Sequence, residues 1–317
     1  MIEVDHLRKH YEDVRAIKDI SFNVRKGEVF GFLGPNGAGK TTTINMLIGL
    51  ALPTAGSFRI AGWNGNKDMK KIQSIIGIVP DESNLYDEMS GFENLVFCAS
   101  LYGIRKHERE KRARNLLEEF NLKETGERPF KAYSKGMKRK LTIAAGIIHR
   151  PEILFLDEPT SGIDVKSARQ IRRMIKRLGE NGTTIFLTTH YIEDAERLCD
   201  RIAFIAEGEI VEMDSMSALL DKAHEDNVIE LRAHGLDHTL FKRLRQEFTD
   251  VNIWRTSGTT IRASSKERLS ITPFLELFEQ HDLHVDEAKI IRPSLEEVFV
   301  RLTGIEADRM TNEEGKA

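Results

Sequence analysis

A glycine-rich segment with one lysine offers the clearest chemistry in this sequence. The segment fits the spacing G-x-x-x-x-G-K-[ST], follows the apolar run Val29–Leu33 and precedes a helix-like run over residues 42–50. Its glycines let the backbone turn several N–H groups toward an anion, and the helix N-terminus adds a partial positive charge. We therefore expect a P-loop (residues 34–41) that binds nucleotide phosphates. Its residues, with the threonine that follows, are Gly34, Pro35, Asn36, Gly37, Ala38, Gly39, Lys40, Thr41 and Thr42.

Two P-loop side chains have distinct expected roles. Lys40 should reach the β- and γ-phosphates, and the Thr41 hydroxyl should bind Mg²⁺. A turn that only joins a strand to a helix is the alternative interpretation. The spacing and the flanking strand and helix patterns together favour nucleotide binding over that alternative.

A hydrophobic run that ends in two carboxylates supplies further chemistry. Residues 153–156 form an apolar run, and Asp157 and Glu158 follow at its carboxyl end, where α/β sheets bind ligands. We expect Asp157 to hold Mg²⁺ through its water shell and Glu158 to orient or deprotonate a water. A strand end with two solvated acids is the alternative, and the P-loop upstream favours the catalytic interpretation.

Short apolar runs alternate with helical patterns from residue 28 to about 205. Their hydrophobicity is continuous, which is typical of parallel strands that are covered on both faces. A helix is indicated by apolar residues spaced three or four apart between 168 and 178. The pattern predicts an α/β, doubly wound fold. The expected strands are 29–33, 75–79, 153–156, 184–187 and 202–205.

The alternation breaks between about residues 83 and 148. This segment has helical patterns, such as Ala113, Leu117 and Phe120 on one face, and no strand pattern, so we expect an inserted helical subdomain. The run from 105 to 114 mixes acids with bases, which favours a solvated helix face over a nucleic-acid patch.

A second, small α+β domain is expected over residues 220–304. Residues 228–232 and 260–263 alternate like strands, and 273–280 and 294–302 have helical patterns. Pro293 and Ser294 predict a helix cap, and Gly304 predicts its stop. Residues 305–317 are polar and are expected to form a frayed tail.

Composition narrows the class of protein. The 317 residues are 40% hydrophobic and 31% charged, which suits a soluble globular protein with a sizeable core. A net charge of −3 argues against nucleic acid as a partner. The chain has two cysteines, Cys98 and Cys199, which fits a reducing cytosol. Since no run approaches 18 apolar residues, any membrane role requires a partner chain.

Further segments resemble motifs of the ATP-binding-cassette (ABC) ATPases, and they occur along this chain in the same order as in that family. Residues 133–141 resemble the family's signature motif, and residues 157–164 resemble the acidic strand end that leads into its D-loop. The resemblance covers about residues 2–215. It implies a P-loop NTPase fold over a nucleotide-binding domain at 1–215, with a mostly parallel core sheet and an N-terminal antiparallel β region.

The resemblance also implies further contacts with ATP. Tyr11 is expected to stack on adenine, and His190 to hydrogen-bond the γ-phosphate and position the attacking water. Ser134 and the Gly136 backbone would bind the γ-phosphate of ATP held by another subunit, with Asp164 bracing the interface. The family therefore implies a head-to-tail homodimer, or a heterodimer with a related ATPase, that is joined through ATP.

Two places depart from the family pattern. Asp81 stands where the family usually has Gln, and its oxygens can still bind Mg²⁺ or water, so it is an expected catalytic and metal contact. A shifted loop, with Glu82 as the contact, is the alternative. In the signature, Lys135 and Met137 replace the usual Gly and Gln, whereas its serine and its second glycine remain.

Some segments resemble those of the ABC-2 exporter group. They are the run 29–33, the Asp81–Glu82 pair that departs from the usual Gln, and the C-terminal run 292–299. This resemblance implies an ATP-hydrolysing motor subunit, cytoplasmic and peripheral on the inner face of the cell membrane. A separate transmembrane permease would dock beside residues 82–105. The alternative is a soluble, non-transport ABC ATPase that acts on ribosomes or DNA. Such proteins usually have two cassettes or a long coiled-coil insertion, and neither is found here.

Overall fold

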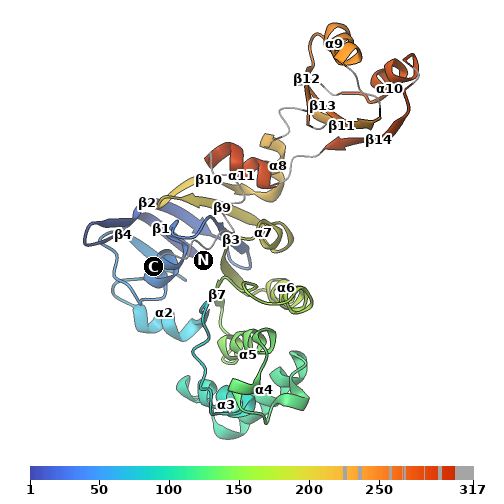
Figure 1. Ribbon diagram of the computed structural model, residues 1–317. Helices are drawn as coiled ribbons and strands as arrows, with labels where there is room; N and C mark the ends of the chain where they lie inside the picture. The colour runs from blue at the N-terminus through green and yellow to red at the C-terminus, as the bar shows by residue number, and fades with distance from the viewer. Residues whose placement is uncertain are drawn as a thin grey trace. The chain divides into compact units, whose positions relative to one another are not determined.

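A ten-stranded sheet organises the first part of the chain in the computed structural model (Figure 1). The structure describes residues 1–223, 227–234, 238–256, 259–265, 267, 269–281, 283–291 and 295–303. The first of two compact units contains Met1–Met216, and the second contains Ser217–Arg301. The strand order of the large sheet is β5-β4-β1-β2-β10-β9-β3-β8-β7-β6.

Five strands form the parallel part of this sheet. Strand β3 pairs with β8 and β9, and β7 pairs with β8 and β6, all in parallel. Every residue of β3, β7 and β8 is buried, so both faces are covered, as their continuous hydrophobicity predicts. The predicted parallel core is confirmed. The strands are β3 (Val29–Leu33), β6 (Ile76–Val79), β7 (Ile153–Asp157), β8 (Thr184–Thr189) and β9 (Arg201–Ala206).

The antiparallel β region that the family resemblance implied is also present. Strand β1 pairs antiparallel with β2 and β4, and β4 pairs with β5. Strand β10 pairs antiparallel with β9 and parallel with β2, so it joins the two halves of the sheet. These strands are β1 (Ile2–Tyr11), β2 (Val14–Val24), β4 (Ala55–Ile60), β5 (Trp63–Asn64) and β10 (Glu209–Ser215).

Helices precede or follow the parallel strands along the chain. The predicted helix after the P-loop is α1 (Lys40–Leu47), and the helix predicted between 168 and 178 is α6 (Val165–Glu180). Helix α6 buries Ile171 and Ile175 on one face and ends just before Gly182, whose φ is +89°. The remaining connections include α2 (Met69–Ile75) and α7 (Ile192–Leu198).

The insert over residues 83–148 is helical, as predicted. Within this fully described range the β-type pairing is limited to one isolated bridge, between Ser90 and Pro129. Ser90 and Glu93 form a capping box that starts the first helix. The elements are α3 (Gly91–Leu101), α4 (Lys106–Glu119), η1 (Lys123–Thr125), η2 (Phe130–Ala132) and α5 (Lys135–Ile147).

The second unit has a βαββαβ order and a four-stranded antiparallel sheet, β12-β13-β11-β14, which is the ferredoxin-like arrangement. Ile229, Leu231 and Phe278 belong to its core. The elements are β11 (Asn227–Ala233), α9 (His238–Glu247), β12 (Asn252–Arg255), β13 (Thr260–Ser265), α10 (Thr272–Glu279) and β14 (Val285–Ile291).

Two further helices, α8 (Met216–Ala223) and α11 (Leu295–Thr303), complete the chain as described. The predicted cap at Pro293 and Ser294, the predicted stop at Gly304 and the tail 305–317 lie outside the described residues. Among the described residues, no helix combines the length and the apolarity that a bilayer crossing requires.

Candidate functional site

The P-loop forms the turn between β3 and α1. Gly37 and Gly39 have φ values of +80° and +105°, which favour glycine. A Cβ at Gly34 would lie 2.1 Å from the carbonyl oxygen of Ile205, so the turn also needs a residue without a side chain at that position. Helix α1 begins without a side-chain cap, and its first N–H groups are therefore suited to an anion.

Lys40 lies buried over this turn. Its Nζ donates to the carbonyl oxygens of Gly34 at 2.7 Å and Pro35 at 3.1 Å. The same nitrogen lies 3.2 Å from Glu158 Oε1, so the lysine also compensates a buried carboxylate. Lys40 lines the same cavity as Gly37 and Gly39 of the P-loop, so its positive charge is available to an anion there.

Asp157 is the last residue of β7 and is buried. Thr41 donates its hydroxyl to Asp157 Oδ2 at 2.9 Å, and the Thr188 hydroxyl donates to Oδ1. A hydroxyl beside a carboxylate is an oxygen donor set that suits Mg²⁺. Among the described residues, no group of three or more His, Cys, Asp or Glu could hold a metal ion. A metal at this pair would therefore also need phosphate oxygens or waters.

Glu158 follows directly and has a left-handed backbone, with φ +46°. Its Oε2 lies 2.9 Å from His190 Nδ1 and accepts the His190 backbone N–H at 3.3 Å. Burial by itself would raise the pKa of the Glu158 carboxyl, but His190 and Lys40 outweigh it and hold this pKa below its usual value. Glu158 is therefore an ionised hydrogen-bond acceptor at neutral pH.

Asp81 faces the same cavity as the P-loop, from the loop after β6. Desolvation raises the pKa of the Asp81 carboxyl, Arg139 lowers it, and the negative charges of Asp157 and Glu158 raise it further, so that it is raised on balance. The cavity has a volume of about 440 Å³. The predicted residues that line it are Asn36, Gly37, Gly39, Lys40, Thr41, Thr42, Asp81 and Glu158.

Other predicted residues lie outside this cavity. Tyr11 is 45% exposed, with the Lys9 ammonium 4.5 Å above its ring, and residues 14–16 line the cavity in its place. Ser134 caps α5 by accepting the Met137 N–H, and Asp164 caps α6 by accepting the Ser167 N–H. The starts of these two helices touch, since a Cβ at Gly136 would lie 2.3 Å from the Ser167 Oγ.

Arg139 is a buried residue of the site that the sequence reasoning missed. It lies on α5, and its guanidinium donates to backbone carbonyl oxygens of Asp81 at 2.9 Å and of Pro159 at 3.0 Å. Burial lowers the pKa of this guanidinium, whereas Asp81, Asp157 and Glu158 oppose that shift. The available sequence signal was a pair of charged residues, Arg139 and Lys140, directly before the mainly apolar run 141–146 of α5.

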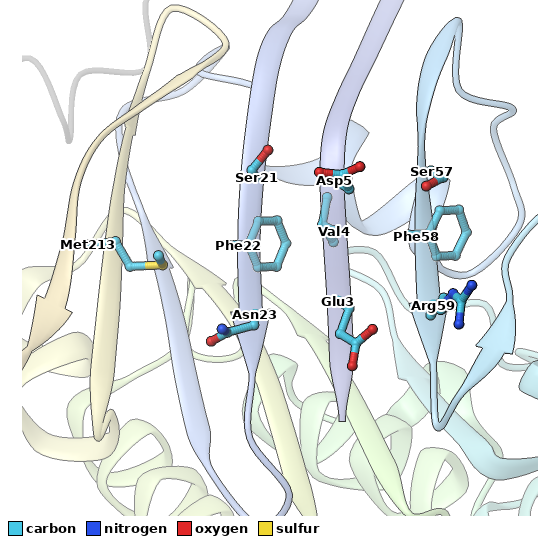
Figure 2. Close-up of a pocket in the computed structure, with 10 residues that line it drawn as sticks. All are labelled: Glu3, Val4, Asp5, Ser21, Phe22, Asn23, Ser57, Phe58, Arg59 and Met213. Atoms are coloured by element: carbon cyan, nitrogen blue, oxygen red, sulfur yellow. The ribbon is translucent and has the colours of Figure 1, made fainter.

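A second cavity, of about 600 Å³, lies over the antiparallel strands and contains no predicted site residue. Figure 2 shows its lining in three rows across β2, β1 and β4. The middle row is Phe22, Val4 and Phe58, which are register neighbours, with polar residues on either side of it. Because it has neither the P-loop nor the acidic end of β7, we assign the chemistry to the first cavity.

Comparisons with known proteins agree with this geometry. A sequence model of the ABC transporter family matches residues 17–161. The linearmycin resistance ATP-binding protein LnrL of Bacillus subtilis is 36% identical over 307 residues, which are 96% of this chain and 98% of that protein. The daunorubicin/doxorubicin resistance ATP-binding protein DrrA of Streptomyces peucetius is 36% identical over 316 residues, which are 99% of this chain and 95% of that protein.

The fold is similar to that of a solved ABC dimer. The ATP-binding cassette MJ0796, determined as a dimer in a post-hydrolysis state bound to ADP and Pi, superposes with a TM-score of 0.63 and 27% identity. The match covers 68% of this chain and 99% of that one. The cassette fold predicted from the motifs is thereby confirmed.

Replacing Lys40 tests the assignment of the P-loop. Lys40→Ala should weaken ATP binding at least about 100-fold, because charge-assisted hydrogen bonds contribute about 1.5–3 kcal/mol each. Titration calorimetry would measure the affinity, with Lys71→Ala, which removes an exposed lysine paired with Asp68, as the control. An unchanged affinity in Lys40→Ala would count against the assignment.

Replacing Asp81 tests whether its carboxylate has a special role. Asp81→Gln should retain ATPase activity within about threefold, because the amide keeps an oxygen ligand and Arg139 binds the main chain of this residue. Phosphate release at saturating ATP is the measurement. Complete loss of turnover would show that the negative charge itself is required.

Proposed function

The chain belongs to the ATP-binding proteins of the ABC transporter family, and we propose that it drives an exporter whose membrane-spanning part is a separate permease. As a member of this family it is an ATPase. The observation that carries the proposal is one cavity that gathers the P-loop, Asp81 and Glu158, in a chain similar over nearly its whole length to drug-resistance ATP-binding proteins.

The P-loop would hold the phosphates of ATP. The uncapped N-terminus of α1 offers backbone N–H donors, and Lys40 Nζ can turn from its carbonyl partners to phosphate oxygens. Thr41 and Asp157 would hold Mg²⁺, with Asp81 as a further oxygen ligand, and when bound this ion neutralises phosphate charge. Tyr11 would stack on adenine, since it pairs across the β1–β2 hairpin with Val14, which lines the cavity.

Glu158 and His190 would prepare the attacking water. An ionised Glu158 carboxylate can accept a hydrogen bond from water and align it, and the contact with His190 fixes the carboxylate's orientation. His190 would also donate to the γ-phosphate. Lys40, 3.2 Å from Glu158, links phosphate binding to the position of this carboxylate.

We also propose that the complete site needs two chains. Ser134, Gly136 and Asp164 lie outside the cavity that the P-loop lines, and they cluster at the adjoining starts of α5 and α6. In a head-to-tail dimer, the α5 N-terminus of one chain would meet the γ-phosphate held by the other. The related cassette MJ0796 was solved as a dimer, which supports a site that needs two chains. A heterodimer with a related ATPase would have the same geometry.

The permease would dock on the helical insert, near residues 82–105. Three large apolar or aromatic side chains are exposed there: Tyr86 at 54%, Leu101 at 69% and Tyr102 at 41%. Tyr86 packs edge-on against Phe97, with ring centroids 5.2 Å apart, so part of this surface is fixed. With such a partner, the chain would be cytoplasmic and peripheral on the inner face of the membrane. The second unit would be an accessory domain.

A substitution at Glu158 tests the ATPase mechanism. Glu158→Gln should keep ATP affinity but slow turnover at least about 100-fold, because the amide is not basic, and a dimer should persist in ATP. Phosphate release and size-exclusion chromatography are the measurements. Glu152→Gln, an exposed acid before the other end of β7, is the matched control. Rapid phosphate release by Glu158→Gln would refute the assigned role.

A substitution on the helical insert tests the exporter proposal. The tagged chain should co-purify from detergent-extracted membranes with a multi-spanning protein. Leu101→Asp should lower that recovery at least roughly tenfold, since burying a leucine is worth about 1.5–3 kcal/mol. Val211→Asp, on β10 and 41% exposed, should leave recovery unchanged. Recovery of ribosomes or DNA in place of a membrane protein would favour a non-transport ATPase.

A further inference from the structure

One buried guanidinium connects three separate segments of the site. Arg139, on α5, is 7% exposed. Its Nε donates to the carbonyl oxygen of Pro159 at 3.0 Å, and its Nη1 donates to that of Asp81 at 2.9 Å and also to that of Pro80. Its Nη2 donates to the carbonyl oxygen of Asp157. All these acceptors are main-chain groups, so the bonds constrain backbone positions.

These acceptors bracket the catalytic groups. Pro80 and Asp81 begin the loop after β6, whereas Asp157 and Pro159 flank Glu158. The guanidinium presents N–H donors in a fixed fork, which lets one side chain satisfy acceptors in several directions. The loop with Asp81 and the turn with Glu158 are therefore held in one relative position by a single cation from a third element.

We propose that Arg139 is a positioning residue for ATP hydrolysis. Its side chain fixes the backbone on both sides of Glu158 and the loop with Asp81, and it makes their placement depend on α5. The same helix begins at Ser134 and Gly136, the residues assigned to the partner's ATP. A shift of α5 would thus be transmitted to the water-orienting carboxylate. This inference rests on the roles in hydrolysis proposed above for Glu158 and Asp81.

The role predicts that Arg139 affects turnover and not nucleotide affinity. The P-loop bonds of Lys40 and the bond between Thr41 and Asp157 do not involve the guanidinium. Misplacing a catalytic group by about 1 Å can lower a rate about 100-fold. Arg139→Met, which keeps an unbranched buried side chain but loses the donors, should therefore lower kcat about 100-fold and change KM for ATP by less than about threefold.

Hydrogen exchange provides a readout other than activity. In Arg139→Met, the backbone amides of residues 81–83 and 158–161 should exchange faster, whereas those of 36–41 in the P-loop should be unchanged. Arg139→Lys should be intermediate in kcat and in exchange, because an ammonium can reach some of the carbonyls but cannot reach all of those in the two acceptor segments. If Arg139→Met does not fold, Arg139→Lys alone supports the same comparison with wild type.

Arg112 offers a matched control on the same helical insert. It lies on α4, where its guanidinium donates to the carbonyl oxygen of Ile148 at 3.1 Å and to Glu108 at 2.7 Å, away from the catalytic loops. Arg112→Met should leave kcat and the exchange of both loops unchanged. If Arg139→Met and Arg139→Lys match Arg112→Met in kcat and exchange, the proposal is overturned.

The two proposals fail in different ways. Rapid ATP hydrolysis by Glu158→Gln would overturn the roles in hydrolysis proposed above. The exchange comparison still applies in that case, and faster exchange confined to 81–83 and 158–161 would support the positioning of these loops by Arg139. Unchanged exchange in both Arg139 variants would overturn it. Faster exchange that also includes residues 36–41 would overturn it as well, because it would indicate general destabilisation.

Discussion

The site depends on holding three carboxylates close together despite their mutual repulsion. Burial raises the pKa of Asp81, and the nearby carboxylates of Asp157 and Glu158 raise it further. Bound phosphates would add to this repulsion. Lys40, from the P-loop, and Arg139, from α5, provide the compensating positive charge. The turn at the P-loop, the acidic end of β7 and the helical insert therefore act as one electrostatic unit.

Site residues that belong to a motif of contiguous residues could be predicted from the sequence. The P-loop and the acidic strand end are encoded by contiguous residues, and the continuous apolar runs gave the parallel strands. Arg139 could not be predicted in this way, because its acceptors lie 58–59 and 18–20 residues away and are main-chain groups without a side-chain signature. Strand β14 was missed for a related reason, since none of its residues is buried and its sequence has no apolar periodicity.

Within one chain, the residues of the signature segment and those of the P-loop occupy different places. Ser134 and Asp164 are used as helix caps, at the N-termini of α5 and α6 respectively. The same residues that stabilise these helices would then face another chain's ATP. Ser134 and Asp164 would thus contribute both to helix stability and to dimer assembly. A substitution at either position would then affect both properties.

The backbone of Glu158 is left-handed, a strained conformation for a residue that must also supply a carboxylate. A non-glycine residue at φ +46° carries about 1–3 kcal/mol of strain, which a glycine would relieve. Glycine would also remove the carboxylate that the geometry of β7, Lys40 and His190 is built around. Greater stability at this position would therefore be gained only by losing the carboxylate to which the orientation of water is attributed above.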